Sequence, residues 1–403
     1  MIKLYTTLLC LGLSLGVFAE RDSVITLDTN DVFFNLEDGS ETFADRHSWH
    51  LAFTLGNRDV SILTNEGFGV ELFLASSNMA DWASFDTSGM SWDNLYNSTE
   101  MWEEGALNLA GQSVHPDYGW GTYNQISKDV NAIRFFVLKL GDGSFKKLRI
   151  NKMTAAGVYT FDYENLDGSN SQSQTIDKAN YDARNFVYFN VQTNSVLDIE
   201  PLSNSWDLVF TKYMAEIQAG PTVAYYPVSG IKLNRGLRVA QREGIEASSN
   251  DTSNLSWSTT ITEIGYDWKS FNRTTFIYDI QDSLAFFVKK PNGEVWKLVF
   301  TGYEGSGQGK YIFDSEKISE GSGTIGLEES MTKEINFYPN PSKGILYFSD
   351  QVDHVSVYNT MGQLVYERRE TLKSIDVNGL NTGSYFVKMS NENSSSHRTL
   401  IIE

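Results

Sequence analysis

The sequence predicts an all-β protein. Aromatic residues make up 13% of its 403 residues. Together with β-branched residues they form short runs that alternate apolar and polar positions, as strands with one face in a core do. Two such runs, SWHLAFT at 48–54 and SWDLVFT at 205–211, are near-copies. In each run the Trp, the Leu and the Phe are expected to face the core, and the alternate residues, His50 among them, to face solvent.

Other landmarks recur in the same order and at nearly the same distance. VFFNL at 32–36 returns as VYFNV at 187–191. Four more pairs follow: YGW at 118–120 with YDW at 266–268, Phe136-Val137 with Phe287-Val288, Lys147-Leu148 with Lys297-Leu298, and YTFD at 159–162 with YIFD at 311–314. The pattern predicts an internal duplication of roughly 150 residues per unit, which is the size of a domain.

The chain begins with the features of a secretion signal, residues 1–19. Lys3 supplies the positive start, residues 8–17 are apolar, and Val17-Phe18-Ala19 is a small-residue cleavage site. Cys10 is the one cysteine of the chain, so cleavage after Ala19 leaves a protein without disulfides that is held by its core. No later stretch approaches 18 consecutive apolar residues, so no transmembrane helix is expected.

The formal net charge is −19 at pH 7. Such an acidic balance disfavours nucleic acid and anionic membrane as the main partners, because both carry negative charge. It is typical of a protein that stays soluble in an extracellular medium.

The first unit, residues 20–170, consists of short predicted strands separated by turns. Residues 62–73 contain the turn signal TNEG between two strand-like runs. The unit closes with a hairpin formed by residues 133–140 and 145–150 around a Gly-Asp-Gly turn.

A long aromatic loop, residues 76–125, interrupts this rhythm of strands and turns. A helical turn is expected within it, near residues 93–102. Long ordered loops on a β scaffold commonly carry binding sites, so this loop is the candidate binding region of the first unit.

The second unit, residues 171–318, follows a connector at 168–180 that is rich in Ser, Asn and Gln. It closes with a hairpin that matches the first, formed by residues 285–289 and 295–301 around a Pro-Asn-Gly turn. Its polar middle, residues 243–258, is expected to be a loop.

The third unit, residues 333–403, follows a glycine-rich acidic linker at 319–332 and predicts a small antiparallel sandwich closed by its final strand. Its motifs are YPNP at 338–341, YNxxGQ at 358–363, LxxGxYFV at 380–387 and a terminal LII. Together they resemble the type A C-terminal sorting domain of the type IX secretion system. The resemblance implies recognition by the secretion machinery and its sorting peptidase, export by way of the periplasm, removal of the tail, and release or attachment at the outer cell surface.

The first two units resemble the HmuY-like haem-binding proteins over most of residues 25–315. The shared elements are the two WxLxFT strands, the IxTNxG segment at 62–67 and the closing hairpins with their FV and KL pairs. The resemblance implies two antiparallel β units in tandem. Most of these positions are core and turn residues, so they indicate the fold more directly than the ligand.

Haem requires a flat apolar slot and one or two axial ligands, which are imidazole or thioether groups. The second unit contains no histidine, so bis-histidine ligation is excluded there. In the first unit His115 is the candidate imidazole and Met79, Met90 or Met101 the candidate thioether, with His115 and Met101 as the expected iron ligands. The candidate walls of the slot are aromatic: Trp82, Trp92, Trp102 and Tyr118. In the alternative interpretation His115 is a surface turn residue and the methionines are packing residues.

The sequence lacks the HExxH, GxSxG and phosphate-loop motifs, and the mature chain lacks a cysteine nucleophile. We therefore expect a binding protein and no enzyme. Two ligand classes remain open, because porphyrins and sugars both offer a flat face to aromatic side chains. One is haem or another tetrapyrrole, bound by a haemophore-like protein. The other is a glycan or a protein, bound by an adhesive or structural surface protein.

Overall fold

The computed structural model describes residues 20–321 and 337–402, except residues 58, 112–114, 182, 245, 247–248, 360–362 and 392–393. The predicted signal peptide, residues 1–19, and most of the predicted linker lie outside the described residues. The chain divides into two compact units, Met1–Gly321 and Ser322–Glu403.

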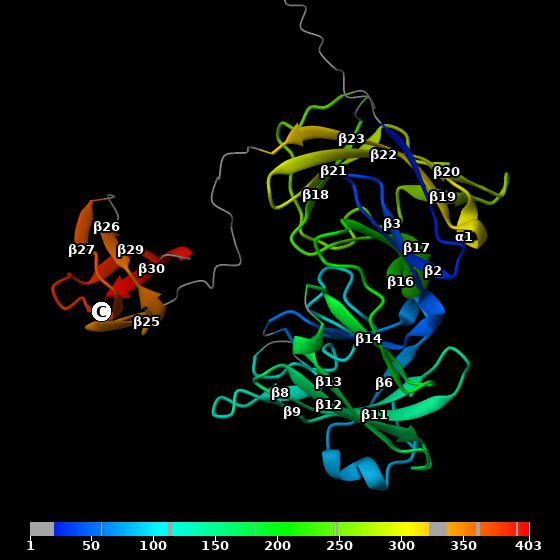
Figure 1. Cartoon of the computed structure of the whole chain (residues 1–403), viewed down its shortest axis with the longest axis horizontal. Coiled ribbons are helices and arrows are strands. Elements are labelled where there is room, and N and C mark those ends of the chain that lie inside the picture. Colours follow the sequence, from blue (N-terminus) through cyan, green and yellow to red (C-terminus); the bar gives the residue numbers. More distant parts are fainter. Residues whose placement is uncertain are drawn as a thin grey trace, which may run out of the picture. The chain divides into compact units, whose positions relative to one another are not determined.

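The fold is all β, as predicted, and its helices are single turns (Figure 1). In the described part of the chain, no helix is long and apolar enough to cross a membrane. The helical elements are η1 (Arg46–Ser48), η2 (Glu66–Phe68), η3 (Met79–Ala83), η4 (Lys178–Asn180) and α1 (Gly305–Gln308).

The first compact unit, up to Gly321, consists of two lobes. Each lobe has two main sheets, and one two-stranded hairpin is added in lobe 2. Lobe 1 contains an eight-stranded sheet and a four-stranded sheet, and its core lies between them. In pairing order the four-stranded sheet is β15 (Ser195–Leu197), β14 (Phe186–Asn190), β4 (Leu51–Thr54) and β5 (Ile62–Thr64). The main path of the larger sheet is β13 (Gln172–Asp177), β12 (Val158–Asn165), β11 (Phe145–Met153), β10 (Phe135–Lys139), β6 (Glu71–Ser76) and β7 (Asn94–Leu95), with β8 (Gly121–Tyr123) and β9 (Val130–Ala132) added at β11.

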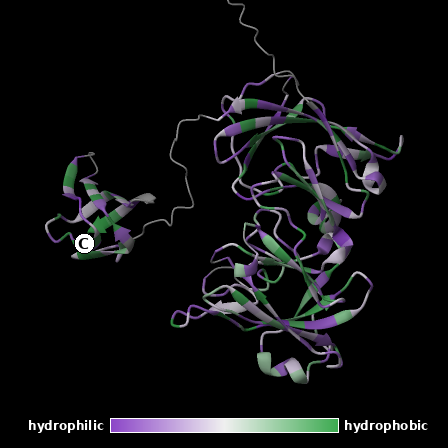
Figure 2. Ribbon diagram, in the orientation of Figure 1, coloured by the Kyte–Doolittle hydropathy of each residue, from purple (hydrophilic) through white to green (hydrophobic). Residues whose placement is uncertain are grey.

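Lobe 2 has the same two-layer plan. Its four-stranded sheet is β17 (Thr222–Leu233), β16 (Leu208–Ala219), β2 (Asn30–Phe34) and β3 (Glu41–Asp45). Its five-stranded sheet is β1 (Glu20–Ile25), β23 (Lys310–Glu320), β22 (Glu294–Tyr303), β21 (Leu284–Lys289) and β18 (Arg238–Glu243), and a separate hairpin is formed by β19 (Lys269–Asn272) and β20 (Ile277–Ile280). Figure 2 shows apolar residues on the strands of both lobes.

The two lobes do not coincide with the two expected sequence units, because each lobe takes strands from both. β1 pairs with β23 and β2 pairs with β16, so the first two strands of the chain complete lobe 2. In return β13 pairs with β12 and β14 pairs with β4, so two strands of the second unit complete lobe 1. The predicted connector at 168–180 is therefore a strand, β13, and residues 319–320 of the predicted linker end β23.

The exchanged strands pair in the same register in both lobes. In lobe 1, Leu51 lies opposite Phe189 and Phe53 opposite Val187. In lobe 2, the corresponding Leu208 lies opposite Phe34, and Phe210 opposite Val32. The closing hairpins β10–β11 and β21–β22 also correspond, but with a correction. Phe136 is equivalent to Phe286 and not to Phe287, because both lie opposite a leucine, Leu148 and Leu298 respectively.

Buried asparagines make equivalent hydrogen bonds in the two lobes. Asn65 follows β5 and donates through Nδ2 to the carbonyl oxygen of Trp49 (2.9 Å). Asn234 follows β17 and donates to that of Trp206 (2.7 Å). A second asparagine in each lobe donates to the carbonyl oxygen of the serine before the Trp. Asn35, directly after β2, donates to Ser205 (3.1 Å). Asn190, the last residue of β14, donates to Ser48 (2.6 Å).

The prediction that His50 faces solvent is wrong, because its exposed fraction is 0%. Its Nδ1 accepts a hydrogen bond from the backbone N–H of Val191 (3.2 Å). The equivalent Asp207 accepts one through Oδ2 from Leu36 (2.8 Å). A neutral imidazole thus replaces a carboxylate as the acceptor that fixes the end of the exchanged strand.

Two further local predictions are corrected. Trp49 does not share a face with Leu51 and Phe53, because it precedes β4 and packs with Ala52 on the opposite side. Residues 93–102 contain no helical turn. The single-turn helix of the aromatic loop lies earlier, at η3.

The second compact unit is the predicted antiparallel sandwich. One sheet is β24 (Phe337–Tyr338), β25 (Ile345–Val352) and β28 (Leu372–Asp376), and the other is β27 (Leu364–Arg368), β26 (His354–Asn359), β29 (Gly383–Asn391) and β30 (Ser394–Ile402). The final strand pairs with β29 and buries Leu400 and Ile402 in the core of this unit.

The burial of His50 predicts a defined pH dependence of stability. Burial lowers the pKa of His50 to about 4, from 6.5. The unfolded chain therefore takes up a proton at a pH where the folded chain does not. This contribution to the free energy of unfolding, about 3 kcal/mol at most, is lost as the pH falls from 6.5 towards 4. In His50→Asn the amide oxygen keeps the acceptor role without titrating.

Urea unfolding of residues 20–321 between pH 4 and pH 8 measures the effect. The wild type should lose more stability than His50→Asn over this interval, while His47→Asn, which replaces an exposed histidine, should follow the wild type. Parallel curves for the wild type and His50→Asn would contradict the prediction.

Candidate functional site

The predicted haem-binding residues of the aromatic loop lie in separate places. Trp82, in η3, packs edge-on against Phe135 and under the cation of Arg149, 4.5 Å from its ring centre. Trp92 is 48% exposed and contacts Phe73 and Phe145. These two tryptophans cover strands β6, β10 and β11 of the eight-stranded sheet and act there as packing residues.

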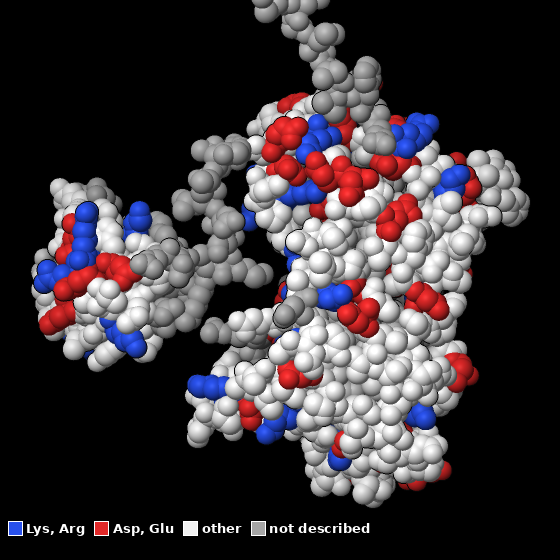
Figure 3. All heavy atoms as spheres, in the orientation of Figure 1, with Lys and Arg blue, Asp and Glu red and all other residues white. Residues whose placement is uncertain are grey.

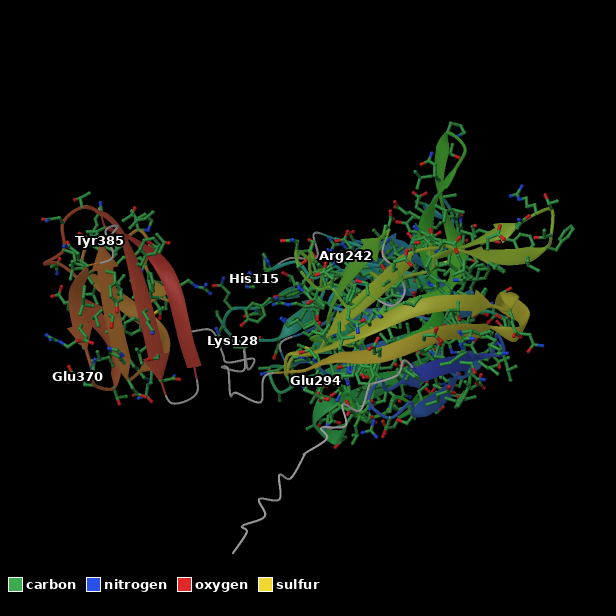
Figure 4. All side chains as sticks on the ribbon, turned by 90° about the horizontal axis from the view of Figure 1, so that it is seen from above. His115, Lys128, Arg242, Glu294, Glu370 and Tyr385 are labelled. Atoms are coloured by element: carbon green, nitrogen blue, oxygen red, sulfur yellow. The ribbon has the colours of Figure 1, made fainter. Side chains whose placement is uncertain are left out.

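His115 is exposed and lies at the periphery of its loop, where Figure 4 labels it. Its ring contacts Tyr123 (5.1 Å between ring centres) and the predicted wall residue Tyr118 (6.3 Å). Among the described contacts, none joins His115 to Met79, Met90 or Met101: Met79 and Met90 are half-buried, and Met101 is 40% exposed.

Trp102 lies in a third place, between the two lobes. Its Nε1 donates to the carbonyl oxygen of Leu233 (2.8 Å), and its ring packs on Phe186. Nor does the described part of the chain gather three or more His, Cys, Asp or Glu side chains in a metal-binding cluster. Of the predicted iron ligands, His115 offers an exposed imidazole with two tyrosine neighbours.

Part of the aromatic loop does form a site, together with residues far along the sequence. A groove of about 700 Å³ lies between this loop, β16–β17 and the loop before β19. We call it the tyrosine groove. Its lining residues are Asn94, Leu95, Tyr96, Asn97, Ser98, Thr99, Glu100, Glu104, Leu109, Tyr213, Ala215, Glu216, Tyr225, Thr262, Gly265, Tyr266 and Asp267.

Buried hydrogen bonds hold the aromatic loop against both lobes. The side chain of Asn97 accepts hydrogen bonds from Thr64 and Ala106 and donates to the Thr64 carbonyl. Glu66 joins the loop to β16, because its two oxygens accept from the backbone N–H groups of Asn97 (2.9 Å) and Met214 (3.0 Å). Burial raises the pKa of this carboxyl. These bonds make the groove wall a fixed part of the fold.

The far wall is tied to the loop in the same way. Thr262 donates through its hydroxyl to the carbonyl of Thr99 (2.7 Å), and the backbone N–H of Ile261 donates to that of Glu100 (2.9 Å).

Aromatic rings and carboxylates give the groove its chemical character. Tyr96 and Tyr225 stack with their ring centres 3.7 Å apart. Burial, with Glu216 close by, raises the pKa of Tyr225 to about 12, so the phenol remains a neutral hydrogen-bonding group. Tyr213 is buried, and no described partner bonds to its hydroxyl.

Four carboxylates line the groove, and its described lining includes no lysine or arginine. They are Glu100, Glu104, Glu216 and Asp267. Figure 3 shows acidic and basic side chains in mixed clusters on one face of the molecule. Lys317, for example, pairs with Glu37 and Glu320. The groove thus combines flat faces, hydroxyl groups and negative charge.

The sequence analysis placed binding in the aromatic loop, and that loop supplies one wall of the groove. It did not identify Tyr213, Tyr225 and Tyr266 as site residues. The first of them, Tyr213, lies 88 residues beyond the end of the loop, and no motif marks them. The Tyr225-Tyr226 pair in an alternating strand was the one available signal, because alternation leaves one of the two rings on each face.

Comparison with known proteins supports both resemblances, but the HmuY match covers the first sequence unit alone and not the second. Residues 336–403 match the secretion system C-terminal sorting domain, and residues 28–163 match the HmuY protein family. A comparison with curated proteins gives no match.

Among solved structures, PorZ of Porphyromonas gingivalis is 11% identical, with a TM-score of 0.16. The alignment covers 70% of this chain, which spans 41% of that PorZ chain. PorZ is described as an essential bacterial surface component of the type IX secretion system.

The sorting domain directs the protein to the outer cell surface or the extracellular space, which confirms the predicted localisation.

Proposed function

We propose that this is a secreted or cell-surface binding protein, with no catalytic role, that holds a glycan in the tyrosine groove. The groove itself is the observation that carries the proposal: a volume of about 700 Å³, which is within the usual range of small-ligand sites, walled by tyrosines and carboxylates. Tyrosine rings stack on the apolar face of a sugar, and carboxylates accept hydrogen bonds from its hydroxyl groups.

The charge of the groove favours this ligand over haem. The propionate groups of a porphyrin would face Glu100, Glu104, Glu216 and Asp267 without a lysine or arginine among the described lining residues to offset them. A neutral or cationic sugar meets no such repulsion.

Haem remains the second candidate, because residues 28–163 match the HmuY family and the sequence resembles its haem-binding members. His115, beside Tyr118 and Tyr123, would be the axial ligand on the protein side. Iron bound to an imidazole supplies redox and ligand-exchange chemistry. The protein would contribute an exposed binding face.

We also infer that residues 20–165 and 172–320 are copies of one ancestral unit. The equal registers of β2–β16 and β4–β14 and the equivalent hydrogen bonds of Asn65 and Asn234 support this inference.

The groove proposal predicts the effect of removing one ring. Tyr225→Ala should weaken binding about fivefold, because a stacked aromatic face contributes on the order of 1 kcal/mol. Titration calorimetry of residues 20–321 with neutral and amino oligosaccharides measures it. Tyr226→Ala is the matched control, since Tyr226 is the exposed neighbour on the same strand and does not line the groove. Equal losses in both variants, or no binding by the wild type, would refute a glycan site in the groove.

Haem binding is tested separately with haemin and residues 20–321. If haem is the ligand, the Soret band should shift and saturate at one equivalent, and His115→Ala should abolish the shift. Met101→Ala should change the spectrum only if the thioether is the second ligand. An unshifted band in the wild type would remove this candidate and leave the glycan proposal untouched.

The tail predicts a transport defect. Deleting residues 400–403 removes the buried Leu400 and Ile402 from the core of the sorting domain. The protein that lacks these four residues should therefore accumulate in the periplasm. Cell fractionation and immunoblotting measure its distribution. Exchanging the exposed Ile401 for serine is the control that should still be exported. Surface display of the deleted form would contradict the role of the final strand.

A further inference from the structure

A second cavity, of about 70 Å³, lies where the two lobes meet. The four-stranded sheets of both lobes contribute to it, and we call it the central cavity. Nine of its twenty lining residues are apolar or aromatic: Phe33, Trp49, Leu63, Trp102, Phe186, Tyr188, Trp206, Val209 and Tyr213. Tyr213 and Asn97 also line the tyrosine groove, so these two residues lie between the groove and the cavity.

The carboxylates of the cavity wall have their hydrogen bonds supplied by the protein. Asp31 accepts from the guanidinium of Arg46 (2.8 Å) and the hydroxyl of Thr211 (2.5 Å). Glu66 accepts the two backbone N–H groups already described. Glu200 accepts the backbone N–H groups of Asn185 and Phe186, and burial raises its pKa to about 7.

Lys232 is different. Its exposed fraction is 6%, and its Nζ lies 4.7 Å from the ring centre of Tyr213 and 5.3 Å from that of Trp102, both of which are cavity walls. Within the described part of the chain, no hydrogen bond or ion pair reaches this nitrogen. Burial lowers the pKa of Lys232, against the opposing charges of Glu66 and Asp31. A buried amine without an acceptor costs free energy that the aromatic contacts offset only in part.

The fold itself does not require a lysine at this position. Lys232 lies opposite Val209 in lobe 2, and the equivalent position in lobe 1 is Leu63, opposite Ala52. Leu63 is buried on the same cavity and packs well there. Leucine thus satisfies the structural role of this position, so the amine of Lys232 calls for an explanation other than stability.

We propose that the central cavity binds a small uncharged molecule that carries a carbonyl or hydroxyl oxygen, which accepts a hydrogen bond from Nζ of Lys232. The ligand is small because the cavity is about 70 Å³. It is apolar apart from its oxygen, because aromatic rings surround it. It is uncharged because an anion would meet the carboxylates that share the wall with Lys232: Asp31, which pairs with Arg46, Glu66 and Glu200.

Saturation-transfer NMR of residues 20–321 tests the proposal with acetamide, butanone, 2-propanol and, as a charged comparison, acetate. The uncharged probes should receive saturation from the protein and acetate should not. In Lys232→Leu the transfer should fall at least fivefold, while the thermal midpoint should stay the same or rise, because the substitution reproduces the packing of Leu63. Lys146→Leu, which changes a half-buried lysine on β11 away from the cavity, should bind as the wild type does.

Three results would overturn the proposal. The first is the absence of transfer to every uncharged probe in the wild type, which would mean that the cavity holds water only. The second is undiminished transfer in Lys232→Leu. The third is a strong preference for acetate, which would mean that Lys232 serves an anion. Lys232→Met gives a second measurement if the leucine variant does not fold.

Discussion

The reciprocal pairing of β2 with β16 and of β4 with β14 is the constraint on which both lobes of the first compact unit depend. Each pair carries apolar residues into the core of one lobe: Val32 and Phe34 in lobe 2, and Val187 and Phe189 in lobe 1. Neither half of the sequence can therefore complete a core by itself. The two lobes are expected to unfold together, because opening either one exposes strands that belong to the other.

The same exchange brings the outer faces of the two four-stranded sheets together and so creates the central cavity. On these faces the equivalence between the halves fails at a few polar positions. Lys232 of lobe 2 stands where lobe 1 has Leu63, and Asp31 of lobe 2 stands where lobe 1 has Phe186. Because the two lobes pair their strands in the same register, residues that differ at equivalent positions are not needed for that pairing and are free to serve a function. The central cavity lies at such departures.

The sequence was sufficient for features that depend on neighbouring residues. Alternation gave the all-β class, turn residues gave both closing hairpins, and the motifs of residues 333–403 gave the sorting domain. Features that depend on distant residues could not be predicted. Part of the polar run at 168–180 forms strand β13 by pairing with β12, which lies next to it only in the folded chain. The buried His50 accepts a hydrogen bond from Val191, which directly follows the exchanged strand β14. The groove draws its walls from residues 94–109 and 213–267, which no local pattern joins.

The order of strands also relates folding to export. β1, which begins at Glu20, pairs with β23, which ends at Glu320. Contacts between residues so far apart form late, because a long loop must close first. The sorting domain follows in sequence, beginning at residue 336. A chain cut short before β23 lacks both the strand that completes lobe 2 and the signal that directs the protein outward. Because the sorting domain follows β23 in sequence, any chain that carries it also contains all the strands of both lobes.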